Sequence, residues 1–128
     1  MADNRKFEQI YTKADRDKIY KKNLKEIRAA LKPLDADMLE LNKHLIEDCA
    51  FYATSIHEIN ALISRDGLVD FYQNGNDQWG TKKSVAAELK PKYTQTYQNL
   101  IKQLTALLPS ESEKNAAAEL MEFIRRDD

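Results

Sequence analysis

The side chains best suited to metal binding or catalysis form a small group near the middle of the chain. Glu40, His44 and Asp48 follow one another at four-residue steps, so on a helix they share one face and could hold a divalent cation. A Glu-x-x-His pair would be a stronger metal signature, but Leu41 and Thr54 occupy the positions where the glutamates would stand. One cysteine and two histidines cannot complete a structural zinc site. We therefore expect a solvated or ion-paired helix face, with no metal and no cofactor.

Signatures of an active site are also missing from the rest of the chain. The three glycines, Gly67, Gly75 and Gly80, match neither a phosphate-binding loop nor a dinucleotide fingerprint. No serine or cysteine stands in a nucleophile-elbow context. Cys49 lies among apolar residues of a predicted helix and is expected to be a small buried hydrophobe. We expect no catalytic residues and no enzyme; a small metal-dependent enzyme using His44 is a third option, which would require metal in the purified protein.

Basic residues are concentrated near the N-terminus and are spaced mostly three or four residues apart. On a helix this spacing places many of them along one side, and such a stripe can meet the phosphates of duplex DNA with strong salt dependence. The candidate DNA-binding residues are Lys18, Lys21, Lys22, Lys25 and Arg28. The alternative is that these cations are solvated or paired with acidic residues on the same helix or on the next one.

Composition favours one small, soluble, helical domain. The chain has 128 residues, of which 42% are hydrophobic and 32% charged, with only 3 glycines and 3 prolines. No secretory signal and no membrane-length apolar run is visible, so we expect a cytoplasmic protein. Charge alternates in blocks: residues 1–33 carry 10 basic and 5 acidic side chains, whereas residues 34–72 carry 2 and 8. The blocks predict either a basic face for an anionic partner or pairing within or between subunits.

Apolar spacing predicts two long helices in the first half of the chain. The first covers residues 13–31, with Pro33 ending it. The second covers residues 35–65, with Asp35 as N-cap and Gly67 as the stop after it. Its apolar positions follow a near-heptad pattern, which we call the seam of the helix. These boundaries divide the chain into a basic N-terminal region at 1–33, a helical core at 34–109 with a connection at 67–84, and a C-terminal segment at 110–128.

The connection and the last two helices are less regular. Residues 68–72 alternate and precede Asn74-Gly75, a strong turn signal, so we expect a small β-hairpin or an extended loop. A third helix follows, starting either at the Ser84 cap with a kink at Pro91 or at Pro91 itself. A capping box at residues 110–113 then predicts a short helix over residues 116–124. The expected fold is all-α, a long antiparallel helical hairpin with flanking helices.

Residues 63–109 resemble the small terminase subunits of tailed phages and prophages of Gram-positive bacteria. The likeness lies in the order Asp66-Gly67-Leu68-Val69, Tyr72-Gln73-Asn74-Gly75, Lys82-Lys83-Ser84 and Leu107-Leu108-Pro109. Family members often carry a proline directly after the serine, where this chain has Val85. The matching part covers roughly half of the chain and contains no catalytic signature.

The resemblance implies a DNA-packaging protein that works in the cytoplasm of the bacterial host. Such a subunit recognises double-stranded phage DNA and recruits and regulates a large terminase subunit, which supplies the ATPase and nuclease. Small terminases are helical and commonly assemble into rings, so we expect a homo-oligomer held by the two seams. The candidate oligomerisation residues are Leu41, Leu45, Tyr52, Ile56, Ile59, Tyr97, Leu100 and Leu104. The alternative function is a coiled-coil-type adaptor without nucleic-acid binding.

Overall fold

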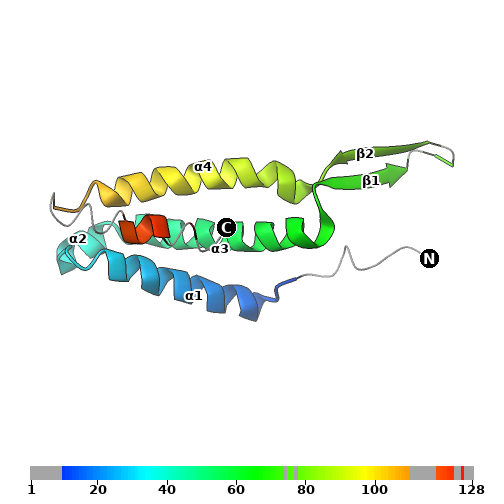
Figure 1. The fold of residues 1–128 in the computed structure, drawn as a ribbon. Helices are drawn as coiled ribbons and strands as arrows, with labels where there is room; N and C mark the ends of the chain where they lie inside the picture. The colour runs from blue at the N-terminus through cyan, green and yellow to red at the C-terminus, as the bar shows by residue number, and fades with distance from the viewer. Residues whose placement is uncertain (1–9, 74, 77, 110–117, 123–124, 126–128) are drawn as a thin grey trace.

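The computed structural model describes residues 10–73, 75–76, 78–109, 118–122 and 125. It is mostly helical, as the sequence predicts, with a β-hairpin between the last two long helices (Figure 1). In chain order the elements are α1 (Lys13–Ala30), α2 (Ala36–Leu41), α3 (Lys43–Asp66), β1 (Val69–Gln73), β2 (Trp79–Lys83) and α4 (Val85–Thr105). Residues 118–122 form a further short helical segment.

The three long helices α1, α3 and α4 pack antiparallel (Figure 1). Helix α3 lies between the other two and contacts both. The apolar positions of all three helices face one shared core, and the short segment at 118–122 adds a side chain to it. The largest fully buried side chains are Ile27, Leu31, Ile46, Cys49, Leu104 and Leu120. One core therefore fixes the rotation of each long helix about its own axis.

Local signals set the bounds of α1 within one residue of the prediction. Thr12 accepts a hydrogen bond from the backbone N–H of Asp15, and the Asp15 carboxylate accepts one from the N–H of Thr12. This capping box satisfies two of the free N–H groups at the helix start, and the sequence analysis did not predict it. The helix ends with Leu31 as C-cap, two residues before Pro33.

The long second helix was predicted as one element, and this is wrong. The chain forms α2 and α3 with a break at Asn42, whose side-chain amide donates to the carbonyl of Met38. That local bond offers the backbone an alternative to a straight helix. The break turns Leu41 out of the seam, and its side chain is 79% exposed. The two predicted ends are confirmed, because Asp35 caps α2 and Gly67 follows α3 with φ 80°.

The connection after α3 is a hairpin rather than an extended loop. Strands β1 and β2 pair antiparallel, with Val69 opposite Lys83 and Gln73 opposite Trp79. Gly75, in the turn, has φ 90°, which suits the Asn-Gly signal. The return strand β2 begins at Trp79, four residues after the turn residue Gly75. The hairpin projects from the end of the bundle (Figure 1).

Helix α4 starts at the earlier of its two predicted positions. The Ser84 hydroxyl accepts a hydrogen bond from the N–H of Ala87, so Ser84 is the N-cap and Pro91 lies inside the helix. The capping box predicted at residues 110–113 lies outside the described residues, as does part of the helix predicted at 116–124. Of that helix, residues 118–122 are helical, and Leu120 is buried in the core.

No helix in the described ranges combines the length and the apolar character needed to cross a membrane.

Candidate nucleic-acid interface

The basic residues predicted to contact DNA lie together on the outer side of α1. At about 100° per residue, they occupy an arc of roughly 120° centred opposite the buried Ile27. All of them are exposed: Lys18, Lys21, Lys22, Lys25 and Arg28. Lys32, just past the helix end, is also exposed. We call the five cations within α1, from Lys18 to Arg28, the basic stripe; Lys32 is not part of it.

Two polar contacts hold α1 in the rotation that turns the basic stripe outward. The Asn23 side-chain amide donates to the hydroxyl of Thr54 at 3.0 Å, inside the interface with α3. At the start of the helix, the Arg16 guanidinium donates to both carboxylate oxygens of Glu58, at 2.7 and 2.8 Å. Bidentate pairs of this kind are geometrically specific. Because both contacts lie on the core side of α1, the opposite side must face solvent.

The basic stripe has no ion-pair partner among the described residues. The ion pairs formed by α1 use Lys13 with Asp17 and Arg16 with Glu58, and neither involves the stripe. The alternative in which the acidic second helix neutralises these lysines is therefore not seen within the described residues. Five cations this close together on one side of a helix create a positive potential that favours an anionic ligand.

The structure places most of the candidate oligomerisation residues inside the chain's own core. Ile56, Ile59, Tyr97 and Leu104 are buried in the monomer. Leu45, Tyr52 and Leu100 are half-buried against the same core. Only Leu41 among the eight is exposed, as described above. The seams thus join helices within one chain, and their use between chains stays a prediction.

The group around His44 is open and does not form a metal site in the described part of the chain. The His44 side chain is 96% exposed, and its Nδ1 lies 3.7 Å from Oε1 of Glu47. Among the described residues, no three metal-ligating side chains come together. Cys49 is buried, and desolvation raises the pKa of its thiol to about 12, so it remains a protonated core residue at neutral pH.

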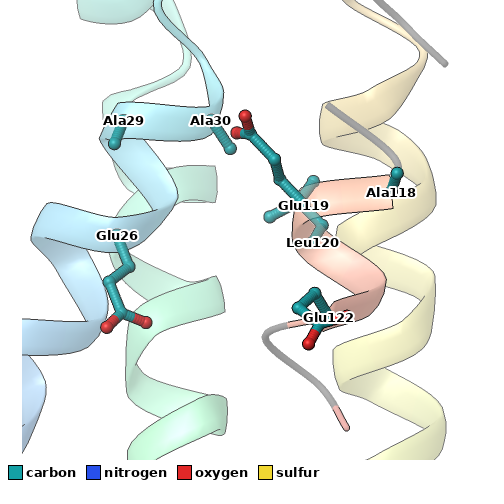
Figure 2. Close-up of a pocket in the computed structure, with 7 residues that line it drawn as sticks. All are labelled: Glu26, Ala29, Ala30, Ala118, Glu119, Leu120 and Glu122. Atoms are coloured by element: carbon teal, nitrogen blue, oxygen red, sulfur yellow. The ribbon is translucent and has the colours of Figure 1, made fainter. Parts of the chain in front are cut away.

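A hollow of about 500 Å³ lies between α1 and the segment at 118–122, and it is lined by alanines, Leu120 and three glutamates (Figure 2). Figure 2 shows that the carboxylates of Glu26, Glu119 and Glu122 do not converge on one point. Glu26 projects from the side of α1, about 100° away from the core-facing Ile27 and outside the arc of the basic stripe. An anion would be repelled from this hollow and attracted to the stripe.

The sequence analysis missed one set of surface residues. The hairpin and its junctions expose several large apolar side chains, Phe71 and Trp79 most of all. The alternation of residues 68–72 indicated a strand, but nothing in it showed that these apolar side chains stay exposed, with none of the described helices covering the hairpin.

Comparison with known proteins yields no matching protein family, no matching curated protein and no matching solved structure. Fold and surface therefore define a class only: a small three-helix bundle with a projecting hairpin and an outward-facing basic helix.

Proposed function

We propose that this chain is a non-enzymatic DNA-binding protein of the small terminase subunit type, which binds duplex DNA through α1. The observation that supports the proposal most directly is the basic stripe, exposed and without an ion-pair partner in the described residues. The sequence likeness of residues 63–109 to small terminases gives the biological setting. In that setting the chain recognises phage DNA and recruits a large subunit that carries the ATPase and nuclease.

The stripe suits phosphate contact rather than base reading. Lysines dominate it, and a lysine ammonium acts as a point charge, whereas base recognition favours the planar forks of arginine, asparagine and glutamine. Helix α1 has 18 residues, which gives a length of about 27 Å at ~1.5 Å per residue. One subunit thus spans only a few phosphates, so binding by a single copy should be weak and strongly dependent on salt. Repetition of the stripe in an oligomer would raise the affinity by multivalency.

A charge-reversal variant tests the proposal. In Lys21→Glu/Lys22→Glu/Lys25→Glu, three of the five stripe cations are reversed while the core side of α1 is unchanged. On a duplex of about ten base pairs, which is long enough for one stripe, the wild type should bind with log K falling against log salt at a slope of about −4 to −5, as expected for five phosphate contacts at ~0.9 each. The variant should lose binding at 50 mM salt in a fluorescence anisotropy titration and keep its helical circular dichroism.

The matched control reverses three exposed lysines on the other helices, in Lys43→Glu/Lys92→Glu/Lys102→Glu. Both triple variants change the net charge equally, so a general charge effect would weaken both alike. The proposal requires the control variant to keep most of the wild-type slope of log K against log salt. DNA binding by the α1 variant at the wild-type level would exclude the stripe as the contact surface.

The second candidate function is an adaptor that binds proteins and not nucleic acid. It is favoured by one observation, the cluster of exposed apolar side chains on and beside the hairpin. If the wild-type protein has no measurable affinity for duplex DNA even at low salt, the adaptor function is favoured over DNA binding.

A further inference from the structure

Exposed apolar side chains are concentrated on and beside the β-hairpin. The described residues expose nine large hydrophobic side chains, and six of these lie between α3 and the first turn of α4: Leu68, Val69, Phe71, Tyr72, Trp79 and Val85. Among the described aromatic side chains the most exposed are Phe71, at 74%, and Trp79, at 71%. Exposed apolar surface gathered in one place marks a site of interaction, so we expect a ligand here.

The strand register places both exposed rings on one face of the hairpin and the acidic residue on the other. Directly paired residues share a face, and so do alternate residues along a strand. One face therefore carries the pairs Val69–Lys83, Phe71–Thr81 and Gln73–Trp79. The opposite face carries the pairs Asp70–Lys82 and Tyr72–Gly80. We call the first the aromatic face; Lys83 is the only charged residue in its three pairs, so its charge is positive.

The two rings of the aromatic face have the spacing of a clamp for one planar group. Phe71 pairs with Thr81, and Trp79 stands two residues before Thr81, so the two aromatic residues are diagonal neighbours. Diagonal neighbours on paired strands are ~7–8 Å apart. A planar group between two rings needs two van der Waals separations of ~3.5–4.0 Å, which add to about the same distance. The ring contacts between described aromatic residues involve neither Phe71 nor Trp79, so both keep their ring faces open.

The size of this surface suits a nucleobase better than a folded protein. A buried Phe or Trp covers roughly 150–250 Å², so the two exposed rings offer on the order of 200–350 Å² together. A standard protein interface buries about 800 Å² on each partner, which is far more. A base needs only one or two ring faces to stack on, and such stacking accepts every base because each has a π-face.

The charge of the aromatic face also suits a nucleic acid. Lys83 is exposed and is the diagonal neighbour of Phe71 on the side away from Trp79. Its ammonium can therefore meet the phosphate next to a base that stacks on Phe71. An apolar partner would have to bury this charge at a cost. Proteins that bind single strands combine the same two features, cations along the backbone and aromatic rings on which bases stack.

We infer that the aromatic face binds DNA with unpaired bases, with Phe71 and Trp79 stacking on a base and Lys83 contacting a neighbouring phosphate. Bases inside a duplex are stacked on their neighbours, so the ligand is a single strand or the unpaired part of a duplex. The inference rests on the proposed function for its ligand class, DNA, and names a part of the DNA that the basic stripe does not contact. It uses no residue of the stripe, so each contact can fail without the other.

Tryptophan fluorescence of the full chain tests the inference with two single-stranded ligands. Trp79 is the only tryptophan, so its emission reports contact with the aromatic face. The probes are a thymidine decamer and an abasic decamer, which has the same phosphates but no bases. At low salt the thymidine decamer should quench the emission and the abasic decamer should leave it nearly unchanged, because only a base can stack on the ring. Equal quenching by both decamers, or quenching by neither, would overturn the inference.

Three substitutions assign the effect to the aromatic face, with binding of a labelled thymidine decamer measured by anisotropy. Trp79→Val keeps a strand-forming residue but removes the ring, so the affinity should fall on the order of tenfold or more. Trp79→Phe keeps a ring and should keep most of the affinity. The control Phe51→Ala removes an exposed ring of α3, outside the hairpin, and should bind as the wild type does. Unchanged affinity in Trp79→Val, or an equal loss in Phe51→Ala, contradicts the inference.

Duplex binding separates this inference from the proposed function. Trp79→Val should bind a blunt duplex as the wild type does, because nearly all base faces of a duplex are covered. The variant Lys21→Glu/Lys22→Glu/Lys25→Glu should lose the duplex but still show quenching of Trp79 that depends on bases. If Trp79→Val also loses the duplex, the hairpin does not select unpaired bases and the inference fails. If protein concentration alone shifts the emission to shorter wavelength and the thymidine decamer has no effect, a second copy covers the aromatic face and the inference is wrong.

Discussion

At the scale of single residues, the orientation of the basic stripe depends on a polar contact in the core. Asn23 and Thr54 are both buried, and the Thr54 hydroxyl also donates to the carbonyl of Ala50 at 2.7 Å. A buried amide is stable only when its hydrogen bonds are made. Rotation of α1 by one residue, about 100°, would break the contact and turn the cations toward α3 or the hollow beside Glu26.

A double-mutant cycle measures this contact. Thr54→Val keeps the shape of the side chain but leaves the Asn23 amide without its acceptor, so unfolding in urea should show a loss of roughly 1–3 kcal/mol. Asn23→Leu/Thr54→Val replaces both groups with apolar ones and should recover much of that loss. The interaction does not exist as described if the double variant is destabilised by the sum of the single effects.

At the scale of elements, the sequence predicted those boundaries that local chemistry decides. Asp35, Gly67 and Ser84 each act within their own turn. The first two were placed correctly, and Ser84 was one of the two helix starts that the sequence left open. The break at Asn42 was missed because heptad spacing continues across it: Leu41 has a seam position in the sequence but an exposed side chain in the fold. Periodicity reports which residues share a face only while the helix stays straight.

Gly80 allows a prediction about the hairpin alone. In Gly80→Ala the new Cβ would lie 2.5 Å from the Tyr72 ring, so the ring must leave the strand and the hairpin should open more often. Backbone amides of β1 should exchange faster with deuterium, whereas those of α3 and α4 should keep their protection. In Tyr72→Ala the ring is absent, so adding Gly80→Ala to it should cause no further increase. Equal acceleration in both backgrounds would show that the ring does not pack on Gly80.

At the scale of the whole molecule, spacing placed the cations on one side of a helix but did not predict which apolar side chains the fold leaves exposed. Heptad seams look alike whether they are covered by the same chain or by another, and here Tyr97 and Leu104 are covered by the same chain. The hairpin is the reverse case. Its alternation indicated a strand, but only the folded structure shows that Trp79 is 71% exposed.

Affinity for DNA should therefore depend on how many stripes one duplex can reach. On a duplex of about ten base pairs, close to the ~27 Å length of one α1, only one stripe can be engaged and binding should be weak. On a duplex several times longer, an assembly that presents several stripes to it should bind on the order of 10²–10⁴-fold more tightly at equal salt. Anisotropy titrations of the wild type on both duplexes measure the two affinities. Equal affinity for the two duplexes would mean that no more than one stripe faces the same duplex.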